Sequence, residues 1–196
     1  MYHRQLTWQK ILCFAAIAVS AVVFLYALGL MTDLYDSLYY TMMDPSNPDD
    51  TWVTGSQIYY HMQPFNRQLL EYSIGMLLLA CLLFITSTHK RRRYYAGNAV
   101  STFAFAAAGV TLSVWCHQQI EMYKAEFLQI NFEELEFFAE MMDTPYIDST
   151  FWFDAHYVVF ALVLLVCALL VHNFIWKHQL MRAEQQLIEE GRRKTA

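Results

Sequence analysis

Histidine and carboxylate side chains provide the first candidate site in this sequence. His117 and Glu121 are four residues apart, so they lie on one face if this segment is helical. Asp154 and His156 precede the last long apolar segment, and they reach the same place if these segments pack side by side. Two imidazoles and two carboxylates suit a divalent metal ion, or a general base with the group that orients it. A hydrogen-bonded pair with a structural role is the simpler interpretation.

Histidines also recur near the ends of the apolar segments, which suggests a second chemistry. His117 and His156 lie at one pair of ends, and His89 and His172 lie at the other. A transmembrane dihaem cytochrome needs one pair of ligands near each membrane face. The sixteen residues from His156 to His172 correspond to about 24 Å of helix, which is a workable separation. His89 lies in a charged turn, however, and we expect no cofactor.

A third candidate is His61, within Tyr60-His61-Met62 and close to Arg67 and Glu71. A histidine-methionine pair just before the second of four apolar segments resembles the bacterial lipoprotein intramolecular transacylase family. The resemblance implies that an extracytoplasmic histidine takes part in acyl transfer, and it is confined to this short segment. Gln63-Pro64-Phe65-Asn66 stands where the family motif continues with an acidic residue and valine.

Four apolar segments must position these residues. The chain has 196 residues, of which 57% are hydrophobic and 16% are charged, whereas about 25% of a soluble domain is charged. A helix crosses about 30 Å of hydrocarbon with about 20 residues. Segments of that length cover residues 11–31, 69–88, 94–116 and 156–176. The sequence therefore predicts an all-α polytopic membrane protein, a four-transmembrane-helix bundle that forms one membrane domain over residues 1–196.

The first apolar segment has an alternative interpretation as a cleaved signal peptide. Arg4 and Lys10 precede it, and Ala27-Leu28-Gly29 fits the small-residue cleavage pattern. The apolar part of a signal peptide is usually about 7 to 15 residues long, and segment 11–31 is longer than that. We therefore interpret it as a retained span.

The basic residues predict the orientation of the chain. Residues 1–10, 89–93 and 177–196 hold 11 of the 13 lysines and arginines. The two long connections, 32–68 and 117–155, hold 14 of the 18 acidic residues. Because positively charged loops stay on the cytoplasmic side, both termini are predicted to be cytoplasmic and both long connections external. The predicted location is the plasma membrane, and a bacterial one fits best.

The long connections contain helical patterns of their own. Apolar residues recur at helical spacing between His117 and Met142, a stretch without proline or glycine. We expect the third apolar helix to continue past Cys116, and a short acidic helix to follow it and end at Thr144-Pro145. The first helix is expected to extend to Asp44-Pro45, and the last to continue through residues 177–196. Together the external helices would form an acidic extracytoplasmic cap.

The motifs of common enzymes do not occur in the sequence. It has no Walker, Rossmann, HExxH or serine-nucleophile motif, and its net charge of −5 offers no basic surface for nucleic acid. We expect contact with the lipid bilayer and a membrane-protein partner, but not with nucleic acid or a nucleotide. The favoured hypothesis is a non-enzymatic accessory or structural subunit of a transport or secretion complex. The alternatives are an extracytoplasmic-face enzyme, acyltransferase-like or metal-dependent, that uses His61, His117 or His156, and a dihaem cytochrome.

Overall fold

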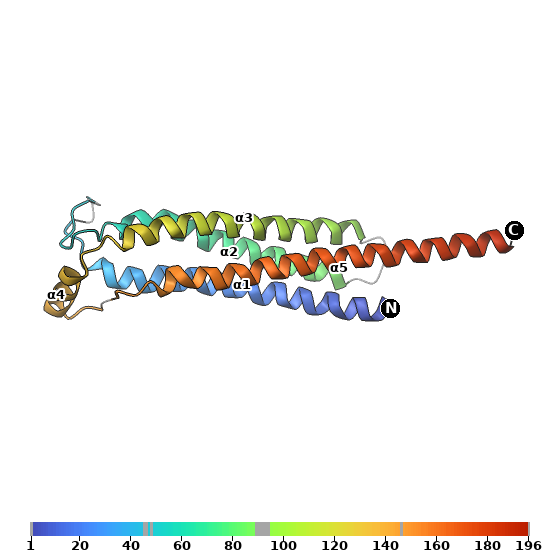
Figure 1. The fold of residues 1–196 in the computed structure, drawn as a ribbon, viewed down its shortest axis with the longest axis horizontal. Coiled ribbons are helices and arrows are strands. Elements are labelled where there is room, and N and C mark those ends of the chain that lie inside the picture. The colour runs from blue at the N-terminus through green and yellow to red at the C-terminus, as the bar shows by residue number, and fades with distance from the viewer. Residues whose placement is uncertain (1, 45–46, 48, 89–94, 146, 196) are drawn as a thin grey trace. The chain divides into compact units, whose positions relative to one another are not determined.

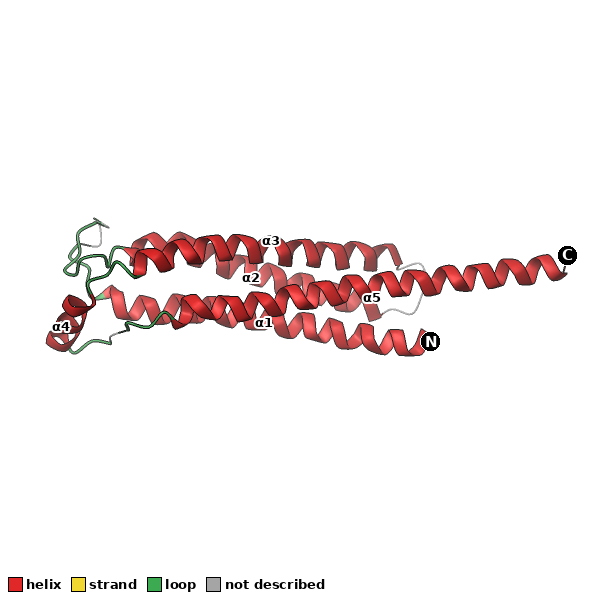
Figure 2. Ribbon diagram, viewed as in Figure 1, coloured by secondary structure: helices red, strands yellow, loops and turns green. Residues whose placement is uncertain are grey.

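The fold of the described residues is entirely helical. The computed structural model describes residues 2–44, 47, 49–88, 95–145 and 147–195. Figure 1 shows the helices in chain order, and Figure 2 shows that the described residues between them are loops, with no strand. The helices are α1 (Tyr2–Tyr39), α2 (Ile58–Thr88), α3 (Tyr95–Phe127), α4 (Phe132–Met142) and α5 (Phe151–Thr195).

Four of these helices are long and apolar enough to cross a membrane. The candidate spans are Arg4–Leu30 in α1, Ile58–Ser87 in α2, Ala96–Phe127 in α3 and Phe151–Lys194 in α5. They confirm the four predicted spans by length and composition, as expected for a multi-pass membrane protein. The helix α4 lies outside all four spans.

Several helices differ from their predicted bounds. The helix α2 begins at Ile58 rather than at residue 69 and contains Pro64 within its second turn. Pro64 lies beyond the first turn, so α2 lacks the backbone hydrogen bond that an N–H at this position would donate to the carbonyl of residue 60. The helix α1 ends at Tyr39, because the chain turns there and Thr41 N–H donates to the Leu38 carbonyl at 3.1 Å. The predicted basic connection 89–93 lies outside the described residues.

The remaining helical extensions are confirmed. The third helix continues past Cys116 to Phe127, and the last continues through the tail to Thr195. The short acidic helix is α4, which buries Leu135 and Ala139. Its N-cap is Asn131, whose side-chain oxygen accepts from the Glu134 N–H at 3.4 Å.

The described helices form two compact units, and each of α1, α2, α3 and α5 contributes a segment to both. Unit 1 comprises Met1–Ser20, Met76–Val110 and Leu162–Ala196, and unit 2 comprises Ala21–Gly75 and Thr111–Ala161. The prediction of a single membrane domain stays a prediction.

In unit 1, the helices α3 and α5 approach closely at a glycine. A methyl group placed on Gly109 would lie 2.7 Å from Cys167 Sγ and 3.1 Å from Val163 Cγ1. Both distances are shorter than ordinary van der Waals contacts, so only a residue without a side chain fits there without rearrangement. The residues Phe105 and Val163 are fully buried in the same unit.

Unit 2 has a core of large apolar side chains to which α4 is attached. Phe127 of α3 and Phe153 of α5 are fully buried, and their ring centroids are 5.1 Å apart. The loop before α2 holds α4 by two backbone groups of Thr54: its carbonyl accepts from the Asn131 N–H at 3.0 Å, and its N–H donates to Glu134 at 3.2 Å. The Phe127–Phe153 contact joins α3 and α5, the two helices that carry the candidate site.

Candidate functional site

The structure brings three of the four predicted metal-ligand candidates together in unit 2. His117 and Glu121 project from one face of α3, and His156 comes from the start of α5. One ligand atom from each residue lies within 4.8 Å of the other two. His117 Nδ1 is 3.0 Å from His156 Nε2, and that atom is 3.9 Å from Glu121 Oε1. We call these three residues the histidine-carboxylate cluster.

Neighbouring groups orient the cluster. His156 is 1% exposed, and its Nδ1–H donates to the Phe153 carbonyl one turn earlier on α5. In the neutral imidazole this bond places the proton on Nδ1, so Nε2 carries the lone pair that faces His117. The Tyr157 hydroxyl donates to Glu121 Oε1 at 2.8 Å, and its ring contacts the His156 imidazole. His156 is therefore held by two hydrogen bonds, and Glu121 is held by the one from Tyr157.

Asp154, the fourth predicted ligand, has other partners. Its carboxylate pairs with Lys124 Nζ at 2.5 Å and accepts the Thr150 hydroxyl at 2.7 Å. Residues two apart on a helix do not face each other, which explains why Asp154 and His156 point to different partners. Lys124 was missed as a site residue, although its spacing of three residues from Glu121 places it on the same face of α3.

His61 belongs to a separate pair in unit 2. Its Nδ1 lies within hydrogen-bonding distance of Glu126 Oε1, and its backbone carbonyl accepts the Tyr123 hydroxyl at 2.9 Å. A carboxylate on one imidazole nitrogen leaves the other able to take up a proton. Arg67 pairs instead with Glu71, four residues later on α2, at 3.3 Å.

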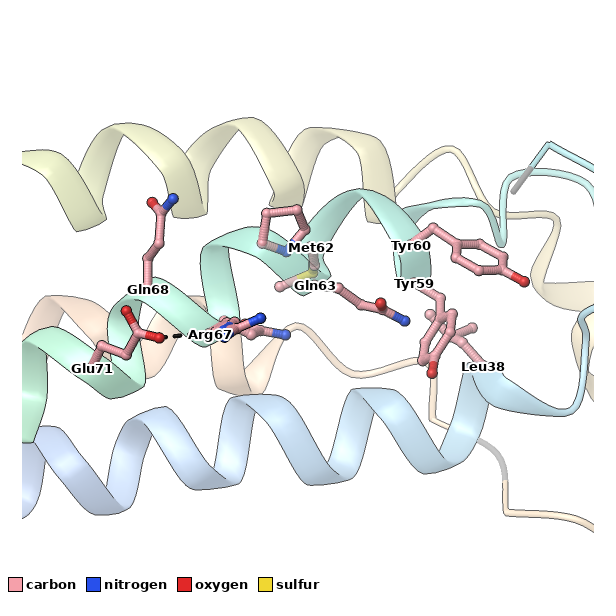
Figure 3. A pocket seen from close by; sticks show the side chains of 10 residues that line it. Leu38, Tyr59, Tyr60, Met62, Gln63, Arg67, Gln68 and Glu71 are labelled. Atoms are coloured by element: carbon pink, nitrogen blue, oxygen red, sulfur yellow. Dashed lines mark hydrogen bonds and ion pairs between the residues drawn. The ribbon is translucent and has the colours of Figure 1, made fainter. Parts of the chain in front are cut away.

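A cavity of about 790 Å³ lies along the first turns of α2, in unit 2. Figure 3 shows Gln63, Arg67 and Glu71 along α2, Leu38 of α1 beside Tyr59, and the ion pair between Arg67 and Glu71, which both line the cavity. Asn66 also lines the cavity, and its buried Oδ1 has no hydrogen-bond partner in the structure. This cavity was not predicted, because residues 60–66 were expected to form a loop.

Unit 1 contains a buried polar network that the sequence analysis also missed. Lys177 Nζ donates to Asn98 Oδ1 at 3.0 Å, and Asn98 donates to the Ser87 hydroxyl at 2.6 Å. Gln9 donates to the Ser87 carbonyl at 3.1 Å, and Gln5 donates to Gln9 at 3.0 Å. Four helices are thereby linked by polar side chains. Gln5, Gln9 and Lys177 lie outside the predicted apolar segments, in residues 1–10 and 177–196, which were predicted to be cytoplasmic.

The arrangement of histidines offers the haem interpretation no support. A haem iron with two histidines takes them on opposite sides, whereas the rings of His117 and His156 are stacked at 27° and bonded to each other. His172 is exposed on α5, and His89 lies outside the described residues.

No protein-family model, curated protein or solved structure matches this chain. Its function is therefore inferred from the side-chain chemistry above.

Proposed function

We propose that the chain is a non-enzymatic accessory or structural subunit of a larger membrane complex, in transport or secretion, and that α4 is its docking element. The observation that carries this proposal is the exposed apolar face of α4. Phe137 is 69% exposed and Met141 is 62% exposed, although α4 lies outside the four candidate spans. We call Phe137, Met141 and Met142 the α4 face.

The physical argument concerns apolar surface in water. Covering such surface is favourable by roughly 25 cal/mol per Å², and aromatic and methionine side chains are enriched at protein interfaces. The α4 face borders a hollow of about 470 Å³, which Trp52 and Tyr40 also line. A hollow beside exposed aromatic residues fits an inserted side chain from a partner.

The charges around the α4 face indicate which kind of partner can bind there. Exposed acidic residues surround it: Glu133, Glu134, Glu136, Glu140 and Asp143. A second copy of this chain would bring carboxylates against carboxylates, and anionic lipid head groups would be repelled in the same way. The partner that fits is a different protein with an apolar patch and a rim of lysine or arginine.

The distribution of basic residues extends this proposal to the membrane in which the chain lies and to its orientation there. The membrane is a bacterial plasma membrane, both termini face the cytoplasm, and α4 forms part of an extracytoplasmic cap. The positive residues of segments 1–10, 89–93 and 177–196 support this orientation.

The test uses two matched variants in membrane-derived nanodiscs. Phe137→Glu places a charge on the α4 face, and Leu187→Glu places one on the tail of α5, where the side chain is equally exposed at 69%. We expect the wild type and Leu187→Glu to co-purify with one partner in fixed stoichiometry, and Phe137→Glu to lose it. A chain that is isolated alone and converts a substrate unaided would overturn the proposal.

A second candidate function is a membrane enzyme that uses His61 as a general base. The specific observation in its favour is the His61–Glu126 pair, because a carboxylate orients an imidazole for proton transfer. The transacylase resemblance of Tyr60-His61-Met62 points to acyl transfer. Under this alternative, His61→Ala and Glu126→Gln abolish the activity of the isolated chain, and unchanged function in both variants would exclude it.

A further inference from the structure

The histidine-carboxylate cluster has the donor atoms of a transition-metal site, a property independent of docking through α4. Two donors lie one turn apart on α3, and the third comes from α5. The same two helices are packed together by the buried rings of Phe127 and Phe153. The donor atoms therefore come from two helices that are fixed against each other within unit 2.

Tautomer chemistry allows both imidazoles to face a cation. His156 Nε2 already carries a lone pair, because Nδ1–H is bonded to the Phe153 carbonyl. His117 Nδ1, 3.0 Å away, donates its proton to that lone pair in the absence of metal. When the proton of His117 moves to its own Nε2, two lone pairs converge. A cation can then replace the shared proton.

Glu121 and the charged residues around it determine the net charge that the cluster presents to a cation. Glu121 Oε1 is fixed by the Tyr157 hydroxyl at 2.8 Å. Lys124 and Asp154 are the nearby charged groups, and they neutralise each other in an ion pair. With both imidazoles neutral, the cluster offers two nitrogen donors and one carboxylate, a set that suits a divalent cation. Hydrogen bonds from outside the ligand set, such as those of Phe153 and Tyr157, are typical of metal sites.

We propose that the histidine-carboxylate cluster binds one Zn²⁺ ion through His117 Nδ1, His156 Nε2 and a carboxylate oxygen of Glu121. Tetrahedral zinc bonds of about 2.0 to 2.1 Å place neighbouring ligand atoms about 3.3 Å apart. The distances from His156 Nε2 to His117 Nδ1 and to Glu121 Oε1, 3.0 Å and 3.9 Å, lie on either side of that value, and one ligand atom from each residue lies within 4.8 Å of the others. Imidazole ligands favour zinc over magnesium or calcium, and water takes the fourth position.

The test is a titration of the purified full chain, after treatment with a chelator, with Zn²⁺ followed by calorimetry. A parallel titration with Co²⁺ reports coordination through its visible absorption. We expect one equivalent of each metal to bind and Co²⁺ to give a tetrahedral spectrum. His117→Ala removes one ligand and Glu121→Gln removes the negative charge of another, so each should weaken binding by at least the roughly tenfold that the loss of an outer hydrogen-bond partner costs.

Matched variants make the result specific to the cluster. His172→Ala removes an exposed imidazole from α5 and should leave the affinity unchanged. His156→Ala is left out of the test, because removing a buried side chain also disturbs the packing of unit 2. Circular dichroism verifies that each variant keeps its helix content. The proposal is overturned if the wild type binds no stoichiometric Zn²⁺, or if His172→Ala weakens binding as much as His117→Ala does.

Discussion

Single residues in the loops of unit 2 hold α4 in place through hydrogen bonds. Asn131 has two: its side chain caps α4 through the Glu134 N–H, and its own N–H bonds to the Thr54 carbonyl at 3.0 Å. Gly55, next to Thr54, has a φ of 91° and faces the Ile130 backbone. A residue with a side chain would be strained in that conformation and would collide with Ile130. The position of α4 therefore depends on a small number of residues in two loops.

The first prediction concerns the cap of α4. Asn131→Ala removes the side-chain oxygen that accepts from Glu134 N–H, which should destabilise α4 by about 1 kcal/mol. Hydrogen exchange of the α4 amides should become faster, while the amides in the middle of α3 should be unaffected. Asn131→Asp should restore protection, because aspartate is an equally good N-cap. Unchanged exchange in Asn131→Ala would show that the cap does not stabilise α4.

The helices of unit 1 are joined by two kinds of contact, close packing of their backbones and hydrogen bonds between buried polar side chains. Gly109 lets α3 approach α5 in unit 1, as expected for helix contacts in membranes, where small residues let backbones come close. In the same unit, the network from Gln5 to Lys177 gives hydrogen-bond partners to buried polar groups, although Gln5 Oε1 has none among the described residues. Packing and hydrogen bonding thus both link the helices of unit 1.

The close packing of α3 against α5 predicts that Gly109→Ala destabilises unit 1. The added methyl group would lie 2.7 Å from Cys167 Sγ, so side chains must move, at a cost of about 1 to 3 kcal/mol. Gly75→Ala in α2 is the matched control, because no atom lies within 4 Å of its added methyl group. Thermal unfolding in detergent should show a lower midpoint for Gly109→Ala alone. Equal midpoints in the two variants would contradict the close packing of α3 and α5.

For the molecule as a whole, charge is divided sharply along the chain. The basic residues occur mainly in segments 1–10, 89–93 and 177–196, whereas α4 and its flanking loops are acidic. Such a distribution orients a membrane protein during insertion. It also leaves the α4 face surrounded by carboxylates, which restricts the partners that it can bind.

A further prediction concerns the orientation of the chain in the membrane. A single cysteine introduced at Glu140, in a variant with the native cysteines replaced, should react with a membrane-impermeant maleimide added to intact cells. A cysteine at Leu187 should react only after the cells are opened, because the tail of α5 is predicted to face the cytoplasm. The reverse pattern of labelling would contradict the proposed orientation.

The sequence was sufficient to predict the four spans, the continuation of α3 and the acidic helix α4, because hydropathy and helical periodicity are local properties. It could not predict that α2 begins before Pro64, since an interior proline removes one backbone hydrogen bond and usually marks a helix boundary. Within the candidate site, the spacing of His117 and Glu121 was informative. The pairing of Asp154 with Lys124 was not predictable, because it depends on how α5 is rotated against α3.

Site-specific crosslinking in living cells can show whether the α4 face contacts a partner protein. A photoreactive amino acid at Met141, which is 62% exposed, should give one discrete adduct with another membrane protein. The same amino acid at Leu187 should give none, and Glu140→Lys should reduce the yield at Met141 by reversing a charge beside the α4 face. The absence of an adduct at Met141, or the same adduct at both positions, would contradict the account.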